Sequence, residues 1–312
     1  MTILHVKDHR YLIIGGTTKA ATTSLFFYLA DHPQVCAANM KETGFFLNAE
    51  YPYPLPLKYR FEDGLEKYEV FFRHCSDARL RVEATPDYLY SPGTPQKVKE
   101  SLPQVKLMFI LREPVSRLVS WYRFAKQTGA LPKTFSFEAY VQEQLTAIEG
   151  GSLNAPQHMR ALEQGRYSLY LKPYFQLFGR ERVCVIFYED FIRNPRQVML
   201  EISFFARVNP TFFDTFEFKV FNETQVMKNP SVHRTYLEIS QRLRKYVNYR
   251  PQIRKVLRSI RLAIEPFYLK MNTCPSEEVT ISPGIKMLLD DYYRDEADAL
   301  VALLKRPVSW QF

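Results

Sequence analysis

The stretch Tyr11–Leu29, YLIIGGTTKAATTSLFFYL, contains a strand pattern, a tight turn and the start of a helix in direct succession. Its first four residues are apolar and favour β structure, and Gly15-Gly16 follows them, which is typical of a strand buried on both faces. The turn consists of small residues, hydroxyl side chains and one cation, Lys19. Apolar residues then recur at helical spacing, so the stretch predicts a β-strand that leads straight into an α-helix.

This junction predicts an anion-binding site. A helix that opens directly after a strand points its N–H groups and the positive end of its dipole at one place, where phosphate or sulfate binds. Lys19 adds a positive charge there, and Thr22, Thr23 and Ser24 add hydroxyl donors. The order differs from the nucleotide P-loop, GxxxxGK(S/T), because the lysine here precedes the small pair Ala20-Ala21 and the hydroxyls come last. The alternative is an ordinary turn with an incidental lysine.

The composition is that of a globular protein with an excess of positive charge. The chain has 312 residues, of which 46% are hydrophobic and 24% charged, and its net charge is +9. Such a charge is consistent with an anionic ligand, although a solvated basic surface explains much of it. We find no zinc-finger spacing, basic heptad helix or aromatic RNA-binding motif, so no nucleic-acid partner is predicted.

The cysteine pattern and the apolar runs of the sequence predict the cellular location of the protein. Cys36, Cys75, Cys184 and Cys274 form neither a CxxC pair nor a close cluster with histidine. We therefore expect four free thiols in a reducing compartment. The pattern shows no signal peptide and no apolar run of transmembrane length, so we expect a cytoplasmic protein with no membrane partner.

Strand-like and helical stretches alternate along the whole chain. This alternation predicts an α/β fold in which a central parallel sheet is flanked by helices, organised as a single domain over residues 1–312. Further strands are predicted at 80–84, 105–111 and 182–188, and helices at 64–74, 94–102, 114–128, 137–148, 166–178, 195–206, 231–247 and 285–304. Irregular stretches at about 47–62, 127–160 and 212–280 are expected to form loops around the site. The pattern does not specify an oligomeric state.

A second anion site is predicted at Arg112. Open α/β sheets bind ligands at the carboxyl ends of their strands, and Lys19, Glu83 and Arg112 all end or follow predicted strands. Arg112 leads into LREPVSRLVSWYRF, and an arginine at a strand end with a nearby helical serine, here Ser120, can hold a phosphate by charge-assisted hydrogen bonds. The alternative is a surface pair between Arg112 and Glu113.

Together the two anion sites resemble those of the sulfotransferase family that uses 3′-phosphoadenosine 5′-phosphosulfate (PAPS). GGTTKAATTSL is similar to the family's phosphosulfate loop, and LREPVSRLVSWY to its 3′-phosphate motif. The chain looks most like the heparan-type and related bacterial O-sulfotransferases, which share segments such as KETGFF (41–46), EATPDY (83–88) and VIFYEDF (185–191). The resemblance covers about residues 11 to 206, with an echo at Trp310.

The resemblance implies an enzyme that transfers the sulfuryl group of PAPS to a hydroxyl of a carbohydrate or small natural product. 3′-Phosphoadenosine 5′-phosphate (PAP) would be the product, and no metal would be required. Lys19 would contact the phosphosulfate, Arg112 and Ser120 would bind the 3′-phosphate, and Glu42 would be the general base. The 5′ end would be held by the residues of the turn: Ala20, Ala21, Thr22, Thr23 and Ser24.

The chain departs from the family pattern at two places. Ala21 stands where the family usually has glycine, and Ala84 where heparan-type enzymes often have lysine. A second catalytic lysine is therefore lost or supplied from elsewhere, for which Lys41 is a candidate. Arg234, or Lys228, is a candidate for a further contact to the 3′-phosphate.

The identity of the base has alternatives. Sulfuryl transfer needs a carboxylate or histidine within hydrogen-bond reach of the attacking hydroxyl. Glu42 is the first candidate, and its alternative is a surface carboxylate paired with Lys41. His158 and His233 lie near the expected acceptor loops and are rival bases.

Two further residues are expected near the site. Glu83 is expected to position Lys19 or the acceptor, and Tyr167 is a candidate acceptor contact or a core residue.

A P-loop-like nucleotide kinase or NTPase is an alternative function, against which the position of Lys19 and the Arg112–Ser120 pair count. A catalytically silent PAP-binding protein is the other alternative.

Overall fold

The computed structural model describes residues 9–54, 56–75, 80–151, 155–218, 226–227, 273–274, 279–308 and 310. The chain divides into two compact units. The first consists of residues 1–121, 137–222 and 281–312, and the second of residues 122–136 and 223–280. The organisation as a single domain stays a prediction.

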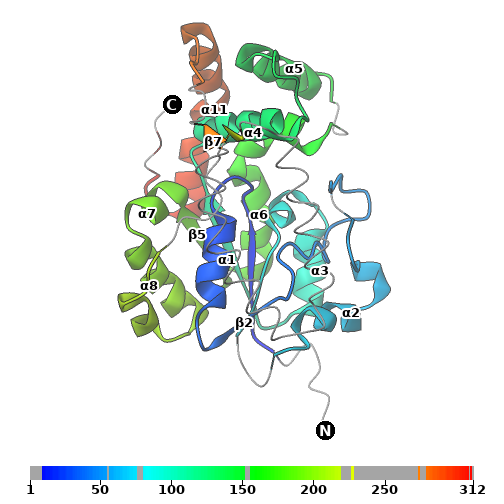
Figure 1. Ribbon diagram of the computed structural model, residues 1–312, viewed down its shortest axis with the longest axis vertical. Helices are drawn as coiled ribbons and strands as arrows, with labels where there is room; N and C mark the ends of the chain where they lie inside the picture. Colours follow the sequence, from blue (N-terminus) through cyan, green and yellow to red (C-terminus); the bar gives the residue numbers. More distant parts are fainter. Residues whose placement is uncertain are drawn as a thin grey trace. The chain divides into compact units, whose positions relative to one another are not determined.

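The first unit is built on a parallel five-stranded sheet with the order β2-β3-β1-β4-β5 (Figure 1). Its strands are β1 (Tyr11–Gly16), β2 (Val35–Ala37), β3 (Leu80–Ala84), β4 (Val105–Leu111) and β5 (Val183–Phe187). Strand β1 lies between β3 and β4, and Tyr11 is in register with Arg81 on one side and Val105 on the other. The turn that follows β1 therefore lies at the middle of the sheet's carboxyl edge, where open α/β sheets bind ligands.

Helices connect the strands, and the predicted α/β class is confirmed. The α-helices that begin in the first unit are α1 (Thr22–Ala30), α2 (Leu65–Glu69), α3 (Thr94–Ser101), α4 (Pro114–Thr128), α5 (Phe137–Glu149), α6 (Tyr167–Phe178), α7 (Tyr188–Arg193), α8 (Pro195–Ala206) and α11 (Pro283–Leu304). The short 3₁₀ helices are η2 (Phe61–Asp63), η3 (Val70–Phe72), η4 (Pro86–Tyr90), η5 (Gln157–Arg160), η6 (Glu163–Gly165), η7 (Arg180–Arg182) and η8 (Pro210–Asp214).

Local sequence signals explain where helix α8 begins and ends. The Asn194 side chain accepts a hydrogen bond from the Gln197 N–H at 3.2 Å and so caps the first turn. Pro195 occupies the first helical position, where a missing N–H costs nothing. Arg207, with φ 56°, ends the helix in the left-handed conformation.

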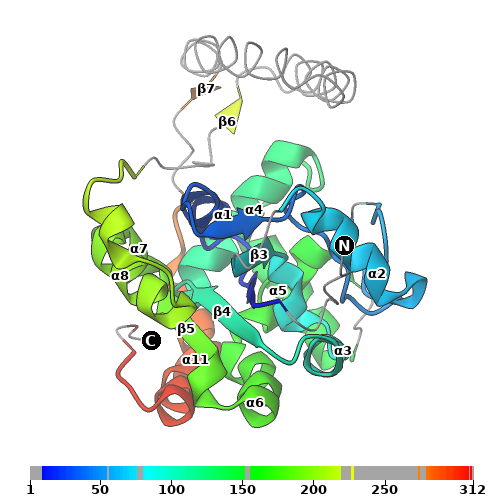
Figure 2. The ribbon, with the colours of Figure 1, turned by 90° about the horizontal axis from the view of Figure 1, so that it is seen from below.

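Apolar side chains cover both faces of the sheet. In β1, Tyr11 and Ile13 belong to the core under α3, α6 and α11, whereas Leu12 and Ile14 belong to the core under α1, α7 and α8. Successive side chains of a strand point to opposite faces, so a strand covered on both sides needs a continuous apolar run. The two helical layers on either side of the strands can be followed in Figure 2.

The expectation of four free thiols is wrong. Cys36 in β2 and Cys75 after η3 form a disulfide, with their Cα atoms 5.9 Å apart and a sequence separation of 39. The two meet because η3 packs beside the β2 end of the sheet, where the Asn39 N–H donates to the Phe71 carbonyl at 2.9 Å. Cys184 is a free thiol, and burial raises its pKa to about 11. The argument for a reducing compartment loses its basis, and a cytoplasmic location stays a prediction.

The second unit is described only in part. It contains the end of α4 and the segment after it, in which the Tyr122 hydroxyl donates to the Phe135 carbonyl at 2.6 Å. Two short strands, β6 (Val226–Met227) and β7 (Thr273–Cys274), pair antiparallel. The predicted helix at 231–247 lies outside the described residues.

Candidate active site

The turn between β1 and α1 has the backbone that an anion site requires. Lys19 and Ala21 adopt the left-handed conformation, with φ of 66° and 61°. Non-glycine residues rarely do so, and such conformations cluster at functional sites. Ala21 is the N-cap of α1, and its side chain makes no capping hydrogen bond. The N–H groups and the positive dipole end of α1 therefore lie at this turn, where an anion can bind.

Arg112 lies against this turn. It follows β4, the strand next to β1, and its Nη1 donates to the Lys19 carbonyl at 3.2 Å. The guanidinium carbon lies 4.5 Å from the centre of the Tyr188 ring. Its buried Nε has no hydrogen-bond partner among the described residues. One donor of Arg112 therefore fixes the turn, and another is left for a ligand.

Two half-buried positive charges thus lie side by side. Burial, followed by the charge of Arg112, lowers the pKa of Lys19 to about 8. Such an arrangement is unfavourable by itself, because burial disfavours a charge and a like charge disfavours it further. A bound phosphate or phosphosulfate would relieve both costs.

Glu113 does not pair with Arg112. Its two carboxylate oxygens accept hydrogen bonds from the N–H groups of Val115 at 2.7 Å and Ser116 at 2.6 Å. Glu113 therefore caps the start of α4, where a negative charge is favoured. The predicted alternative, a surface pair between Arg112 and Glu113, is not among the ion pairs of the described residues.

The turn is held from behind by Arg117, which our sequence analysis missed. This side chain is fully buried, and its Nε donates to the Thr18 carbonyl at 3.1 Å. Its other nitrogens donate to the Ala161 carbonyl at 3.0 Å and to Gln164 Oε1 at 3.2 Å. Trp121 Nε1 donates to Thr18 Oγ1 at 3.2 Å. An arginine one turn beyond Pro114, within the motif that carries Arg112, was the signal that could have identified it.

The remaining predicted cofactor residues lie around this turn or outside the described chain. Ala20, Thr22 and Ser24 are buried, whereas Ala21 and Thr23 are half-buried. Ser120 is buried on α4. Arg234 lies outside the described residues, as do Lys228 and His233.

Tyr167 is a support for Arg112 in this structure. Its side chain is fully buried in α6, and its hydroxyl donates to the main-chain carbonyl of Arg112 at 2.7 Å. Its ring lies 5.9 Å from that of Trp310, centre to centre. Of the two predicted readings, acceptor contact or core residue, this position fits the core residue, because no surface of Tyr167 is open to an acceptor.

Glu42 occupies a second left-handed position, with φ 65°. Its N–H donates to the Ala84 carbonyl at the end of β3 at 2.8 Å. Lys41 forms an ion pair with Oε1, and the Tyr53 hydroxyl donates to Oε2 at 3.1 Å. The predicted pair with Lys41 therefore exists. The Glu42 side chain remains 33% exposed, so its carboxylate is oriented and still accessible.

Glu83 supports the turn that carries Glu42. It is buried, and the Thr43 hydroxyl donates to its Oε2. Burial raises the pKa of Glu83 to about 7, against the opposing effect of hydrogen bonds such as that from Thr43. Its partner is the residue next to Glu42, and no part of Glu83 is open to an acceptor.

Asp87 is a second carboxylate near Glu42, and our sequence analysis assigned it no role. It is buried, and both Tyr51 and Gln157 donate hydrogen bonds to its Oδ1, the former at 2.8 Å. Burial raises the pKa of Asp87 to about 6; hydrogen bonds oppose this shift, and the charge of Glu42 adds to it. A polar residue directly after Pro86, in the quoted EATPDY segment, was the available signal.

His158, a rival base, lies next to Gln157 in η5. Burial lowers the pKa of His158 below its usual value, so the ring is neutral near pH 7 and able to accept a proton. Its carbonyl accepts a hydrogen bond from Tyr140. The choice between Glu42 and His158 stays a prediction.

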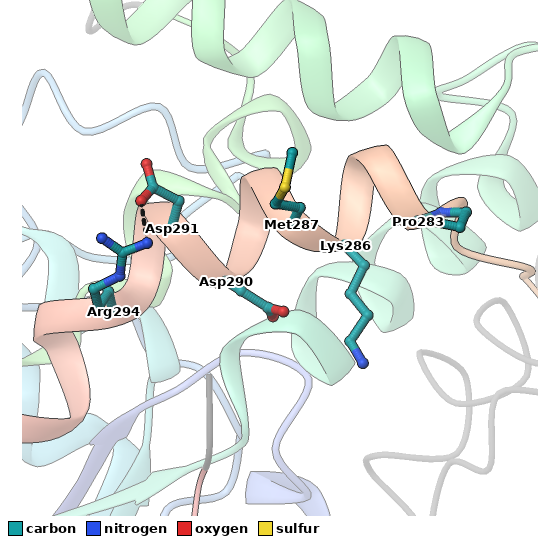
Figure 3. A pocket seen from close by; sticks show the side chains of 6 residues that line it. All are labelled: Pro283, Lys286, Met287, Asp290, Asp291 and Arg294. Carbon is teal, nitrogen blue, oxygen red and sulfur yellow. Dashed lines mark ion pairs between the residues drawn. The ribbon is translucent and has the colours of Figure 1, made fainter.

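Two surface hollows lie away from these residues. One, of about 420 Å³, runs along α11 and is lined by Pro283, Lys286, Met287, Asp290, Asp291 and Arg294. Figure 3 shows Met287 and Asp291 leaving one side of the helix and Lys286 the other, with an ion pair between Asp291 and Arg294. The other, of about 280 Å³, lies beside β5 and α7. Neither contains a predicted site residue.

Cys36, His74 and Cys75 also lie together, with His74 Nε2 at 3.5 Å from Cys36 Sγ. Three such groups could ligate a metal ion. Here the two sulfurs are bonded to each other, which removes both thiolates from the ligand set.

Comparison with known proteins agrees with this geometry. The chain is 24% identical to the membrane-associated sulfotransferase kil1 of Dictyostelium discoideum, over 96% of this chain and 66% of that protein. It is 25% identical to the bifunctional heparan sulfate N-deacetylase/N-sulfotransferase 4 of Mus musculus, over 66% of this chain and 23% of that protein. The chain thus spans just under two thirds of the first relative and less than a quarter of the second. No helix in the part of the chain described here is long and apolar enough to cross a membrane.

A solved structure shows the same fold. The crystal structure of a sulfotransferase from Alicyclobacillus acidocaldarius matches with a TM-score of 0.67 at 22% identity, covering 96% of this chain and 98% of that one. The sulfotransferase domain family model matches residues 9–254, which include both anion sites and both carboxylates. On this match, the chain belongs to the sulfotransferase domain family.

Proposed function

We propose that this chain transfers the sulfuryl group of PAPS to a hydroxyl of a carbohydrate or small natural product and releases PAP. The observation that carries this proposal is that Lys19 and Arg112, both half-buried, lie together at the start of α1. Two cations at a helix N-terminus fit a ligand with phosphate groups. The family match favours this function over a nucleotide kinase.

Different residues would bind the two phosphate ends of the cofactor. PAPS supplies an activated sulfuryl group whose bond to the 5′-phosphate breaks in the transfer. Lys19 and the N–H groups at the start of α1 would neutralise the negative charge that builds on that phosphate. Arg112 and Ser120 would hold the 3′-phosphate, with the free Nε of Arg112 as one donor. The charge stabilisation in this proposal uses no metal ion.

Glu42 would act as the base. The acceptor oxygen attacks sulfur, the bond between sulfur and the phosphate oxygen breaks, and the hydroxyl proton passes to Glu42. The carboxylate suits this role, because it is partly exposed and each of its oxygens has one fixed donor. Lys41 would hold the base rather than replace the missing second lysine.

Binding of PAP tests the cofactor site. Calorimetry with PAP, and with ADP plus Mg²⁺ as the kinase control, separates the 3′-phosphate requirement from general nucleotide binding. We expect PAP to bind selectively and Arg112→Ala to weaken it. Arg193→Ala is the matched control, because Arg193 is exposed on α7 and pairs with Asp190. Equal binding of ADP with Mg²⁺ would contradict the proposal.

The acceptor group needs a separate test, because one relative is named for N-sulfation. Glucosamine oligosaccharides and their N-acetylated counterparts differ only in whether the amine is free. Transfer of radiolabelled sulfate from PAPS to both would place the product on a hydroxyl, as proposed. Transfer to the free-amine form alone would replace the hydroxyl acceptor with an amine.

A further inference from the structure

Two tyrosines of one short segment contact the two carboxylates of the site. The Tyr51 hydroxyl donates to Asp87 Oδ1 at 2.8 Å, and the Tyr53 hydroxyl donates to Glu42 Oε2 at 3.1 Å. The segment is itself held, because the Tyr53 N–H donates to the Tyr51 carbonyl at 2.7 Å and Pro52 restricts the backbone between them. One rigid turn therefore reaches two carboxylates that come from different parts of the chain.

Each carboxylate is fixed on its other side as well. Glu42 is held by Lys41 at its second oxygen and by its N–H, which donates to the Ala84 carbonyl. Asp87 is held by Gln157. Glu42 is 33% exposed at its side chain, whereas Asp87 is buried, so only Glu42 is open to an acceptor.

The negative charge of Glu42 acts on Asp87. The negative charge of Glu42 contributes to the raised pKa of Asp87, after burial. Glu42 and Asp87 also both help to raise the pKa of Tyr53, again after burial, so the phenol stays a donor. The charged and titratable groups that act on this pair or on its two tyrosines are Lys41, Tyr51, Tyr53, Glu83, Tyr90, Arg117 and Arg160.

We propose that Tyr51-Pro52-Tyr53 is a carboxylate clamp, which holds Asp87 and Glu42 as an electrostatically coupled pair and makes Tyr53 the positioning residue for the base. The inference rests on the proposed role of Glu42 in sulfuryl transfer. The clamp therefore sets the direction of the base.

The coupling can be measured without knowing the acceptor. Carbon-13 labelled carboxylates of Asp87 and Glu42 are titrated by NMR in the PAP-bound full-length chain, with signals assigned from Asp87→Asn and Glu42→Gln. We expect the Asp87 midpoint to fall when Glu42 is replaced by glutamine, because the neighbouring charge is gone. An Asp87 midpoint that is the same in wild type and Glu42→Gln would overturn the coupling.

The positioning role is measured by turnover. Tyr53→Phe keeps the ring and removes the donor, so we expect kcat to fall about tenfold or more, with KM for the acceptor within about twofold. The acid limb of the pH–rate profile should move to higher pH, because a carboxylate that loses a donor becomes more basic. Tyr59→Phe, in the same connection and packed on Phe71 through its ring, is the control.

The outcomes separate this inference from the proposed function. A wild-type protein that neither binds PAP nor transfers sulfate defeats the proposed function, and the clamp with it as a catalytic device. A wild-type protein that turns over, is inactivated by Glu42→Gln, and shows the same kcat and pH profile in Tyr53→Phe defeats the clamp alone. If Tyr53→Phe has a lower melting temperature and an unchanged pH–rate profile, the role of Tyr53 is structural.

Discussion

Arg112 donates a hydrogen bond to the main-chain oxygen of Lys19, although 93 residues separate them in the sequence. The contact exists because β1 and β4 are neighbours in a parallel sheet, so their carboxyl ends meet at one edge. It places a second cation against the lysine at the start of α1. The first two predictions follow from this pair.

Arg112→Ala should weaken PAP binding about 10- to 100-fold, since hydrogen bonds to charged groups contribute about 1.5–3 kcal/mol. The variant should affect PAP more than adenosine 5′-phosphosulfate, which lacks the 3′-phosphate. Calorimetry on both ligands measures the difference. An equal loss for both would show that Arg112 acts on the turn rather than on the 3′-phosphate.

Lys19 should take up a proton when PAP binds. In the free protein its pKa is lowered to about 8, and a nearby phosphate favours the charged form and raises it. PAP affinity should therefore fall as the pH rises through about 8 and above. Calorimetry near pH 8 in buffers of different ionisation enthalpy measures the proton uptake. Lys19→Met should abolish it, whereas Lys286→Met, exposed on α11, should leave it unchanged.

Glu83→Gln should stabilise the protein above neutral pH. Folding raises the pKa of Glu83 from 4.5 to about 7, so the folded state binds a proton that the unfolded state releases. The stabilising effect of that proton is complete below about pH 4.5 and is lost as the pH rises through about 7. The loss is on the order of 3 kcal/mol, from about 1.36 kcal/mol for each unit of pKa.

The measurement compares chemical denaturation of wild type and Glu83→Gln at about pH 5 and about pH 8. The free energy of unfolding of the variant should exceed that of wild type at the higher pH only. Glu181→Gln is the control, because its side chain is 73% exposed. A constant difference between wild type and Glu83→Gln at both pH values would contradict the prediction.

Cys75→Ser should lower the free energy of unfolding by about 4 kcal/mol, the chain-entropy value for a closed loop of this length. The bridge spans 39 residues and joins the edge strand β2 to the residue after η3. Denaturation without reductant measures the loss. A thiol reductant should remove the difference between wild type and variant, and a non-reducing digest should recover the peptide that joins Cys36 to Cys75. Equal stability without reductant would speak against the bridge.

Much of the fold was predictable from local patterns. The strands at 80–84 and 105–111 and the helices at 137–148 and 195–206 lie where apolar periodicity placed them, because burial on one or both faces imposes that periodicity. The three-residue strand β2 was not assigned from the sequence, since so short a run carries no clear period. The disulfide was missed because cysteine spacing does not report a contact made through packing.

The candidate site was predictable for residues to which a local motif assigns a role. Lys19, Arg112 and Glu42 were identified from the segments that contain them, and the structure shows Arg112 against Lys19 and Glu42 with an oriented, accessible carboxylate. Arg117 and Asp87 stand in quoted segments and were still missed, because a sequence segment does not reveal which of its charged side chains will be buried.

By itself the sequence determined a strand, a turn and a helix in direct succession, the pattern that predicts an anion site, because propensity, apolar period and turn residues are local properties. Only the tertiary structure decided that β4 would lie beside β1 and bring Arg112 to Lys19. It also decided that Tyr51 and Tyr53 would meet Asp87 and Glu42. Such contacts depend on strand order and register, which follow from the packing of the whole sheet rather than from any segment of it.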